Sequence, residues 1–86
     1  MPQSEQVGAE ARHITIEVNH QPVRMAGDDA TGLQIKEAAI AQGVRIDLDF
    51  VLSRKHGDKW IVVADEEHLE LRKGEEFNAT APDDNS

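Results

Sequence analysis

The sequence predicts a single α+β domain in which one helix lies across one face of a mixed sheet of four to five strands. Three observations predict this class. The chain has only 86 residues, enough for one small domain. Its apolar residues mostly alternate with polar ones in short segments, as in strands that bury one face. One segment near the middle has the composition and the end signals of a helix.

The first predicted element is a strand at residues 14–18 that begins a hairpin. Alternation puts three apolar side chains on its buried face, namely Ile14, Ile16 and Val18. A polar break that ends at Pro22 separates this strand from a second alternating segment at 23–25. We therefore expect two adjacent antiparallel strands.

The helix is predicted over residues 33–42. Thr31 fits the N-cap position, and Gln34 follows it at the spacing of a capping box. Gly43 is suited to end the helix because glycine readily adopts positive φ. The helical face expected to pack on the sheet carries Ile35, Ala38, Ala39 and Gln42.

The second half of the chain is predicted to be extended. Residues 44–49 alternate and should form a connection with its apolar side chains turned inward. Strands are predicted at 50–54, 60–63 and 69–72, with the last one beside the first in the middle of the sheet. An early hairpin, one helix, a later hairpin and a central last strand make up the β-grasp arrangement.

Polar segments without apolar periodicity bound this domain. Residues 1–12 predict a flexible N-terminal arm, and residues 78–86 predict a flexible C-terminal tail. The β-grasp domain is therefore expected to span residues 13–77.

Composition excludes several classes of function. The formal net charge is -8, from 17 acidic and 9 basic residues, so the chain should repel nucleic acid phosphates. The absence of cysteine removes disulfides, thiolate ligands and a thiol nucleophile. No segment has the length of apolar sequence that a membrane helix needs, and no secretory signal is visible. We expect a cytoplasmic, monomeric protein with an acidic surface.

Catalytic and metal-binding patterns are not visible in the sequence. No serine lies in a nucleophile motif, and the acidic run 65–67 is expected to be solvated. No metal-ligand spacing relates the four histidines, which are His13, His20, His56 and His68. We therefore expect a non-catalytic domain without metal or cofactor.

Three short motifs occur in a fixed order along the chain. They are Ile16-Glu17-Val18-Asn19, Thr31-Gly32-Leu33-Gln34-Ile35 and Gly74-Glu75-Glu76-Phe77. With this order and spacing the chain resembles the ubiquitin-like β-grasp domains and, more narrowly, the bacterial multiubiquitin family. The resemblance covers about residues 14–77, which is most of the chain.

The resemblance implies a protein tag. Such tags occur beside activating, conjugating and deconjugating enzymes in bacterial operons, some of them tied to antiphage defence. The C-terminal carboxylate is adenylated, passed to a thiol and joined to a target amine or hydroxyl. The implied conjugation tail, which must be thin enough to enter an enzyme channel, includes Phe77, Asn78, Ala79, Thr80, Ala81 and Ser86.

The end of the chain departs from the usual tag, because it reads Asp84-Asn85-Ser86 rather than two glycines. Three alternatives follow. The first is a modifier that is trimmed by a protease or uses its tail differently. The second is a non-covalent adaptor whose acidic surface docks a basic partner. The third is a sulfur carrier, which also requires two terminal glycines and therefore ranks last.

Partner recognition is expected on two surfaces. Ubiquitin presents an apolar patch on the sheet face away from its helix, and Val51 and Arg72 are the residues we match to it. Because Arg72 is charged, recognition should be more electrostatic or should use Leu33 and Ile40 on the helix. Trp60 is expected either to be partly buried at a hairpin end or to anchor an interface. Surface lysines that could accept a tag are Lys36, Lys55, Lys59 and Lys73.

Overall fold

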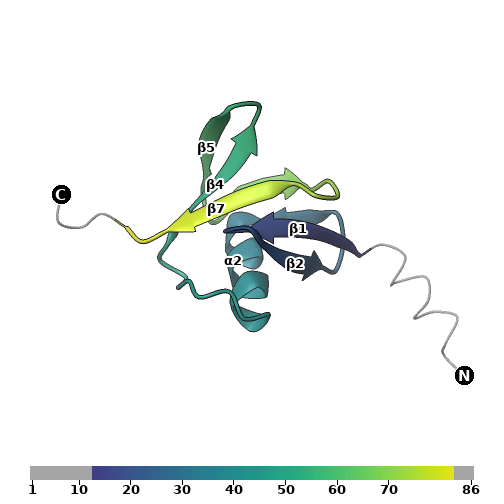
Figure 1. Cartoon of the computed structure of the whole chain (residues 1–86), viewed down its shortest axis with the longest axis horizontal. Coiled ribbons are helices and arrows are strands. Elements are labelled where there is room, and N and C mark those ends of the chain that lie inside the picture. The colour runs from purple at the N-terminus through teal and green to yellow at the C-terminus, as the bar shows by residue number, and fades with distance from the viewer. Residues whose placement is uncertain (1–12, 83–86) are drawn as a thin grey trace, which may run out of the picture.

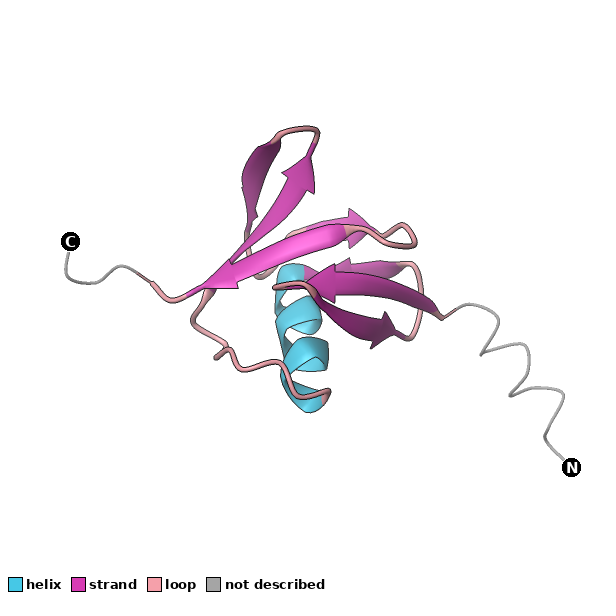
Figure 2. Cartoon of the chain, viewed as in Figure 1, coloured by secondary structure: helices cyan, strands magenta, loops and turns pink. Residues whose placement is uncertain are grey.

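The computed structural model describes residues 13–82, in which one helix packs against a five-stranded sheet (Figures 1 and 2). The predictions made for residues 1–12, for the end of the tail at 83–86 and for Ser86 lie outside these residues. The elements, in chain order, are β1 (Ile14–Val18), β2 (Gln21–Met25), β3 (Asp29–Thr31), α2 (Gly32–Ala41), β4 (Val51–His56), β5 (Lys59–Val63), β6 (His68–Glu70) and β7 (Glu76–Thr80).

The main sheet is mixed, and its strand order is β2-β1-β7-β4-β5. β1 and β7 run parallel in the middle, whereas the β1–β2, β4–β7 and β4–β5 pairs are antiparallel. A second sheet contains only β3 and β6. One helix across a mixed sheet with the last strand beside the first confirms the predicted α+β, β-grasp fold.

The core lies between α2 and the sheet. Ile16 and Val18 are fully buried on β1, as alternation predicted, and Ile35 and Ala39 meet them from the helix. The largest fully buried side chains are Phe77, Ile16, Ile35, Leu52, Val18 and Val23. Within residues 13–82, no helix is long and apolar enough to cross a membrane.

The helix ends follow the predicted chemistry. The Thr31 hydroxyl accepts a hydrogen bond from the Gln34 N–H at 3.2 Å, and the Gln34 side chain accepts one from the Thr31 N–H at 2.9 Å. This is the predicted capping box. Gly43 follows the C-cap with φ of +100°, a value that favours glycine.

The start of the helix lies against the end of β5. A Cβ on Gly32 would stand 2.4 Å from the Ala64 carbonyl oxygen, so only glycine fits there without movement. The Gly32 N–H donates to the Glu67 carbonyl and the Leu33 N–H to the Asp65 carbonyl. The loop after β5 therefore satisfies backbone donors in the first turn of the helix.

The central last strand is not the one we predicted. Residues 69–72 were expected beside β1, but β7 occupies that place and β6 pairs with β3 instead. The turn between them contains Gly74, whose φ is +79° and whose N–H donates to the Thr15 carbonyl at 2.8 Å. Phe77, the largest fully buried side chain, explains the outcome, because β7 places it beside Val18 in the core.

This arrangement corrects the predicted domain limit at residue 77, which falls inside β7. The segment 78–80 consists of small residues, and two of the three, Asn78 and Ala79, are depleted in strands. It is nevertheless extended, because β4 pairs with it along its whole length.

The connection between α2 and β4 agrees in part with its prediction, since Val44 and Ile46 are buried but Leu48 is exposed.

Candidate functional site

The sheet face opposite the helix carries three exposed apolar side chains. Register partners share a face, and Val62 lies opposite Ser53 while Trp60 lies opposite Lys55. Val51, two residues before Ser53 on β4, shares that face. We call Val51, Trp60 and Val62 the outer apolar patch. Val62 lies between the other two, and the exposed fractions of Trp60 and Val62 are 48% and 63%. Two predicted candidates, Val51 and Trp60, thus belong to one surface.

β5 also exposes an apolar side chain on the other face. Ile61 is 51% exposed and lies opposite Arg54, whose guanidinium pairs with Glu75. The β4–β5 hairpin extends away from the rest of the sheet, and the helix does not cover it (Figure 1). Three consecutive apolar residues of this outermost strand are therefore exposed, which is unusual for an edge strand.

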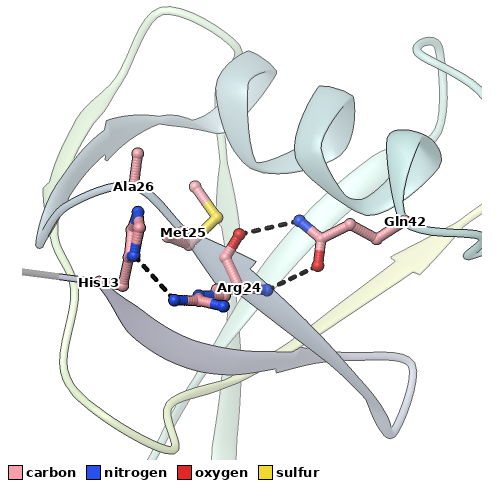
Figure 3. Close-up of a pocket in the computed structure, with 5 residues that line it drawn as sticks. All are labelled: His13, Arg24, Met25, Ala26 and Gln42. Carbon is pink, nitrogen blue, oxygen red and sulfur yellow. Dashed lines mark hydrogen bonds between the residues drawn. The ribbon is translucent and has the colours of Figure 1, made fainter. Parts of the chain in front are cut away.

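The opposite edge of the sheet, β2, is closed by the helix C-cap. The Gln42 amide donates to the Arg24 carbonyl at 2.8 Å and accepts from the Arg24 N–H at 2.8 Å (Figure 3). The backbone groups of Arg24 therefore point away from β1, and by alternation so do those of Pro22. Because proline has no N–H, no outward-facing N–H of β2 lacks a partner.

A shallow depression beside this edge is lined by His13, Arg24, Met25, Ala26 and Gln42 (Figure 3). An Arg24 guanidinium nitrogen lies 3.0 Å from the His13 Nδ1. The depression has no acid–base pair of the kind that catalysis uses. In the described part of the chain, no three His, Asp or Glu side chains gather as metal ligands would.

The exit of the C-terminal strand is held by Asn19. Its side-chain amide donates to the Ala79 carbonyl at 3.0 Å, and its side-chain oxygen accepts from the Ala79 N–H at 2.8 Å. Asn19 lies in the β1–β2 turn with φ of +54°, a conformation that asparagine tolerates better than most residues. The amide thus continues the β1–β7 ladder beyond the end of β1.

The predicted conjugation tail is wrong over most of its described length. Phe77 and Ala79 are buried in the core, and Asn78 and Thr80 pair with β4. These residues cannot enter an enzyme channel without breaking the central strand. Only Ala81, with Pro82 after it, leaves the sheet as an exposed segment.

The other partner-binding candidates do not join the outer apolar patch. Arg72 lies in the exposed turn between β6 and β7, where its N–H donates to the Glu75 side chain, so the match to the last strand was wrong. The exposed Ile40 and the half-buried Leu33 lie on α2, across the sheet from the patch. The outer face of β7 presents polar residues, which are Glu76, Asn78 and Thr80.

Lys36 is a residue whose role the sequence did not reveal, since it was grouped with surface lysines. It is 3% exposed, and its Nζ donates to the carbonyls of Leu48 at 2.6 Å and Phe50 at 2.9 Å. The same nitrogen lies 2.7 Å from the Asp65 carboxylate. Lys36 therefore ties the helix to both ends of the β4–β5 hairpin and is not accessible as an acceptor amine.

Comparison with known families gives a match to a family model. The sequence model of a family described as Multiubiquitin matches residues 14–83, which include every strand and the helix. No curated protein and no solved structure shows significant similarity to the chain. The match spans most of the chain, and the three motifs identified in the sequence all lie within it.

Proposed function

Because the chain belongs to the multiubiquitin family, we propose that this ubiquitin-like protein acts as a modifier in a bacterial conjugation pathway. In this proposal it is a substrate of an activating enzyme, a conjugating enzyme and a deconjugating protease, and it carries no catalytic residues of its own. Antiphage defence is the setting in which such a pathway would operate. The observation that carries the proposal is the family match over the whole folded domain.

The geometry of the C-terminal strand supports a tail that begins later than the sequence indicated. β7 is held by β4 on one side and by Asn19 on the other as far as Ala79. The first residue free to leave the sheet is Ala81, so the tail of the modifier comprises residues 81–86 or a processed part of them. Ala81 is small, whereas Pro82 and the acids after it suit a narrow channel poorly, which favours trimming by a protease.

In this proposal the activating enzyme first converts the C-terminal carboxylate into an acyl adenylate. The terminal carboxylate attacks the α-phosphorus of ATP, and pyrophosphate leaves. A cysteine thiolate of the activating enzyme then attacks the acyl adenylate and releases AMP, and the resulting thioester is passed to the conjugating enzyme.

Partner enzymes would recognise the outer apolar patch, because its exposed Trp60 is of the residue type most enriched at interface hot spots.

The proposal is tested with an activating enzyme of a bacterial ubiquitin-like pathway, ATP and three forms of the protein. These are the full chain and forms that end at Ala81 and at Pro82. Intact-mass measurement should show an acyl adenylate, or an enzyme thioester that reducing agent removes, with at least one form. The control is the same form with ATP omitted. Absence of any adduct with all three forms contradicts the proposal.

A non-covalent adaptor is the second candidate, favoured by the exposed apolar strand β5. Deleting residues 81–86 separates the two functions, because the deletion leaves β7 and the outer apolar patch intact. A modifier loses its attachment to targets after this deletion, whereas an adaptor keeps its partner affinity. The deletion must not begin at Asn78, since that would remove three of the five residues of the central strand.

A further inference from the structure

β5 is an edge strand with unpaired backbone groups. Ala79 in β7 makes its backbone bonds on the β1 side, so its register partner Leu52 in β4 bonds to Val63 in β5. Alternation along β5 then turns the N–H and C=O groups of Trp60 and Val62 away from β4. Among the described residues, no hydrogen bond to these outward groups is present. The edge offers two donors and two acceptors to an added strand.

The side chains of β5 suit an apolar partner on both faces of the sheet. Trp60 and Val62 lie on the outer face and Ile61 on the helix side, and each is about half exposed or more. Natural edge strands are usually protected by charges, prolines, bulges or a covering segment. β5 has a lysine only at its first residue, Lys59, and no proline. An open edge with apolar residues on both faces is suited to strand addition.

The charges beside β5 are unequal at its two ends. At its start Lys59 lies beside Asp58 and Lys55 pairs with Glu76, so the charges there nearly balance. The acidic run Asp65–Glu67 follows its end, and although Asp65 pairs with Lys36, Glu66 and Glu67 remain as exposed acids. A strand added antiparallel to β5 would place its N-terminal end opposite this acidic run. Basic residues would be attracted at that end more than at the other. Antiparallel pairing is also slightly more stable per residue than parallel pairing.

We propose that the β5 edge is a binding site for an extended segment of a partner protein, added antiparallel to Trp60–Val62. The segment has apolar side chains at alternate positions and basic residues at its N-terminal end. The backbone groups of Trp60 and Val62 pair with it, and the outer apolar patch receives its apolar side chains. The site is separate from the tail, so it can exist in a modifier or in an adaptor.

Other occupants fit the edge less well. Residues 1–12 contain Val7 but no alternating pair of large apolar residues, and residues 83–86 are polar and acidic. A second copy would bring together two chains that each carry a net charge of -8. A basic partner segment is attracted by the same charge.

Trp60 makes the site directly measurable. It is the only tryptophan, and the chain has no tyrosine, so the intrinsic fluorescence reports on the β5 edge. The probe is a synthetic peptide, Arg-Lys-Val-Thr-Val-Thr-Val, added to the full chain at low salt. We expect saturable binding with a blue-shifted Trp60 emission, since an added strand covers the indole. A peptide with the two basic residues at its C-terminal end should bind about ten-fold more weakly.

Substitutions at Val62 test the role of the backbone. Val62→Pro removes one outward N–H without removing a bond to β4, and we expect about ten-fold weaker peptide binding. Val62→Thr is the matched control, because it keeps the N–H and the β-branched shape, and its affinity should change less than three-fold. Val62→Lys keeps the N–H but repels the basic peptide, so it tests the site even if the proline variant fails to fold. A thermal unfolding transition like that of the parent verifies the fold of each variant.

Two results would overturn the proposal. One is the absence of any Trp60 response to the peptide up to millimolar concentration, or equal affinity of the parent, Val62→Pro and Val62→Lys. The other is self-association of the full chain in sedimentation without peptide that Val62→Lys abolishes, because the occupant would then be a second copy. Both measurements need no enzyme or ATP, so their failure leaves the modifier proposal unaffected.

Discussion

The two edges of the main sheet differ in how their backbone groups are satisfied. On β2, the side chain of Gln42 binds both outward groups of Arg24, and Pro22 has no N–H to offer. On β5, the outermost strand at the other side of the sheet (Figure 1), no comparable group among residues 13–82 covers the outward positions, and the side chains there are apolar. An edge strand invites association with other chains, so a fold that protects one edge and leaves the other open directs association to one side.

The outward backbone groups of β2 are satisfied by a side-chain carboxamide, which has a donor and an acceptor like a peptide group. Asn19 uses it inside the sheet, where it pairs with the N–H and C=O of Ala79. Gln42 uses it at the edge, where it pairs with the same groups of Arg24. In both cases the strand that would normally pair with these backbone groups is absent at that position. The side-chain amide replaces it, because one amide supplies both a donor and an acceptor. Among residues 13–82, no side chain does this at the β5 edge.

The largest effect is expected at Lys36, which anchors the hairpin that carries the open edge. Lys36→Ala removes two hydrogen bonds from a buried ammonium group to backbone carbonyls and the pair with Asp65, and should lower the free energy of unfolding by about 3 kcal/mol. Urea unfolding followed by Trp60 fluorescence measures it. Lys36→Met keeps the packing of the aliphatic stem and should lose about 1 kcal/mol less. A loss below 1 kcal/mol for Lys36→Ala would show that the anchor is not needed.

A smaller effect is expected at Asn19, where the carboxamide lies inside the sheet. Asn19→Ala should cost about 2 kcal/mol, because two hydrogen bonds to Ala79 are lost and alanine disfavours a φ of +54°. Asn19→Gly removes the same bonds without the backbone strain, so its cost should be lower by about 0.5–1 kcal/mol. Equal stability of the alanine variant and the parent in chemical denaturation would rule out this role.

At the protected edge, Gln42→Ala should cost about 1 kcal/mol, since its two hydrogen bonds are more exposed to water. A more informative readout than global stability is the hydrogen exchange rate of the Arg24 amide. It should be at least about ten-fold higher in the variant, as measured by NMR. Gln42→Glu is the matched control, because it can accept from the Arg24 N–H and should retain most of the protection. An unchanged Arg24 exchange rate would mean that the β2 edge is closed by something else.

The smallest effect on stability is expected at Pro22. Pro22→Val supplies the missing outward N–H and should change the free energy of unfolding by less than about 0.5 kcal/mol. Combined with Gln42→Ala, it should turn β2 into a second open edge with two outward donors. The double variant should then associate in sedimentation at concentrations where the parent does not. A monomeric double variant would show that backbone exposure alone does not make an edge available.

Local signals in the sequence predicted much of the fold. Thr31 and Gln34 specify the start of the helix within four residues, and alternation along β1 specifies which face of that strand is buried. These features depend only on neighbouring residues, so they can be recognised without knowledge of the partner. The family match covers residues 14–83 and therefore includes these motifs.

The candidate site was predicted less well, because its parts are set by contacts between distant segments. Val51 and Trp60 were named separately, and only the β4–β5 register places them on one face with Val62. Lys36 looked like any exposed lysine, since the carbonyls that bury it lie 12 and 14 residues away in the chain.

By itself the sequence determined the helix, its cap, the buried face of the first strand and the family. Tertiary structure alone decided which late segment completes the sheet and which edge stays open. Two segments, 69–71 and 77–79, alternate and bury their apolar side chains, and only the pairing of the strands shows that the second, with Phe77 beside Val18, lies in the main sheet. Alternation specifies the face of a strand but not its neighbours, because neighbours are chosen by the free energy of the whole packed core.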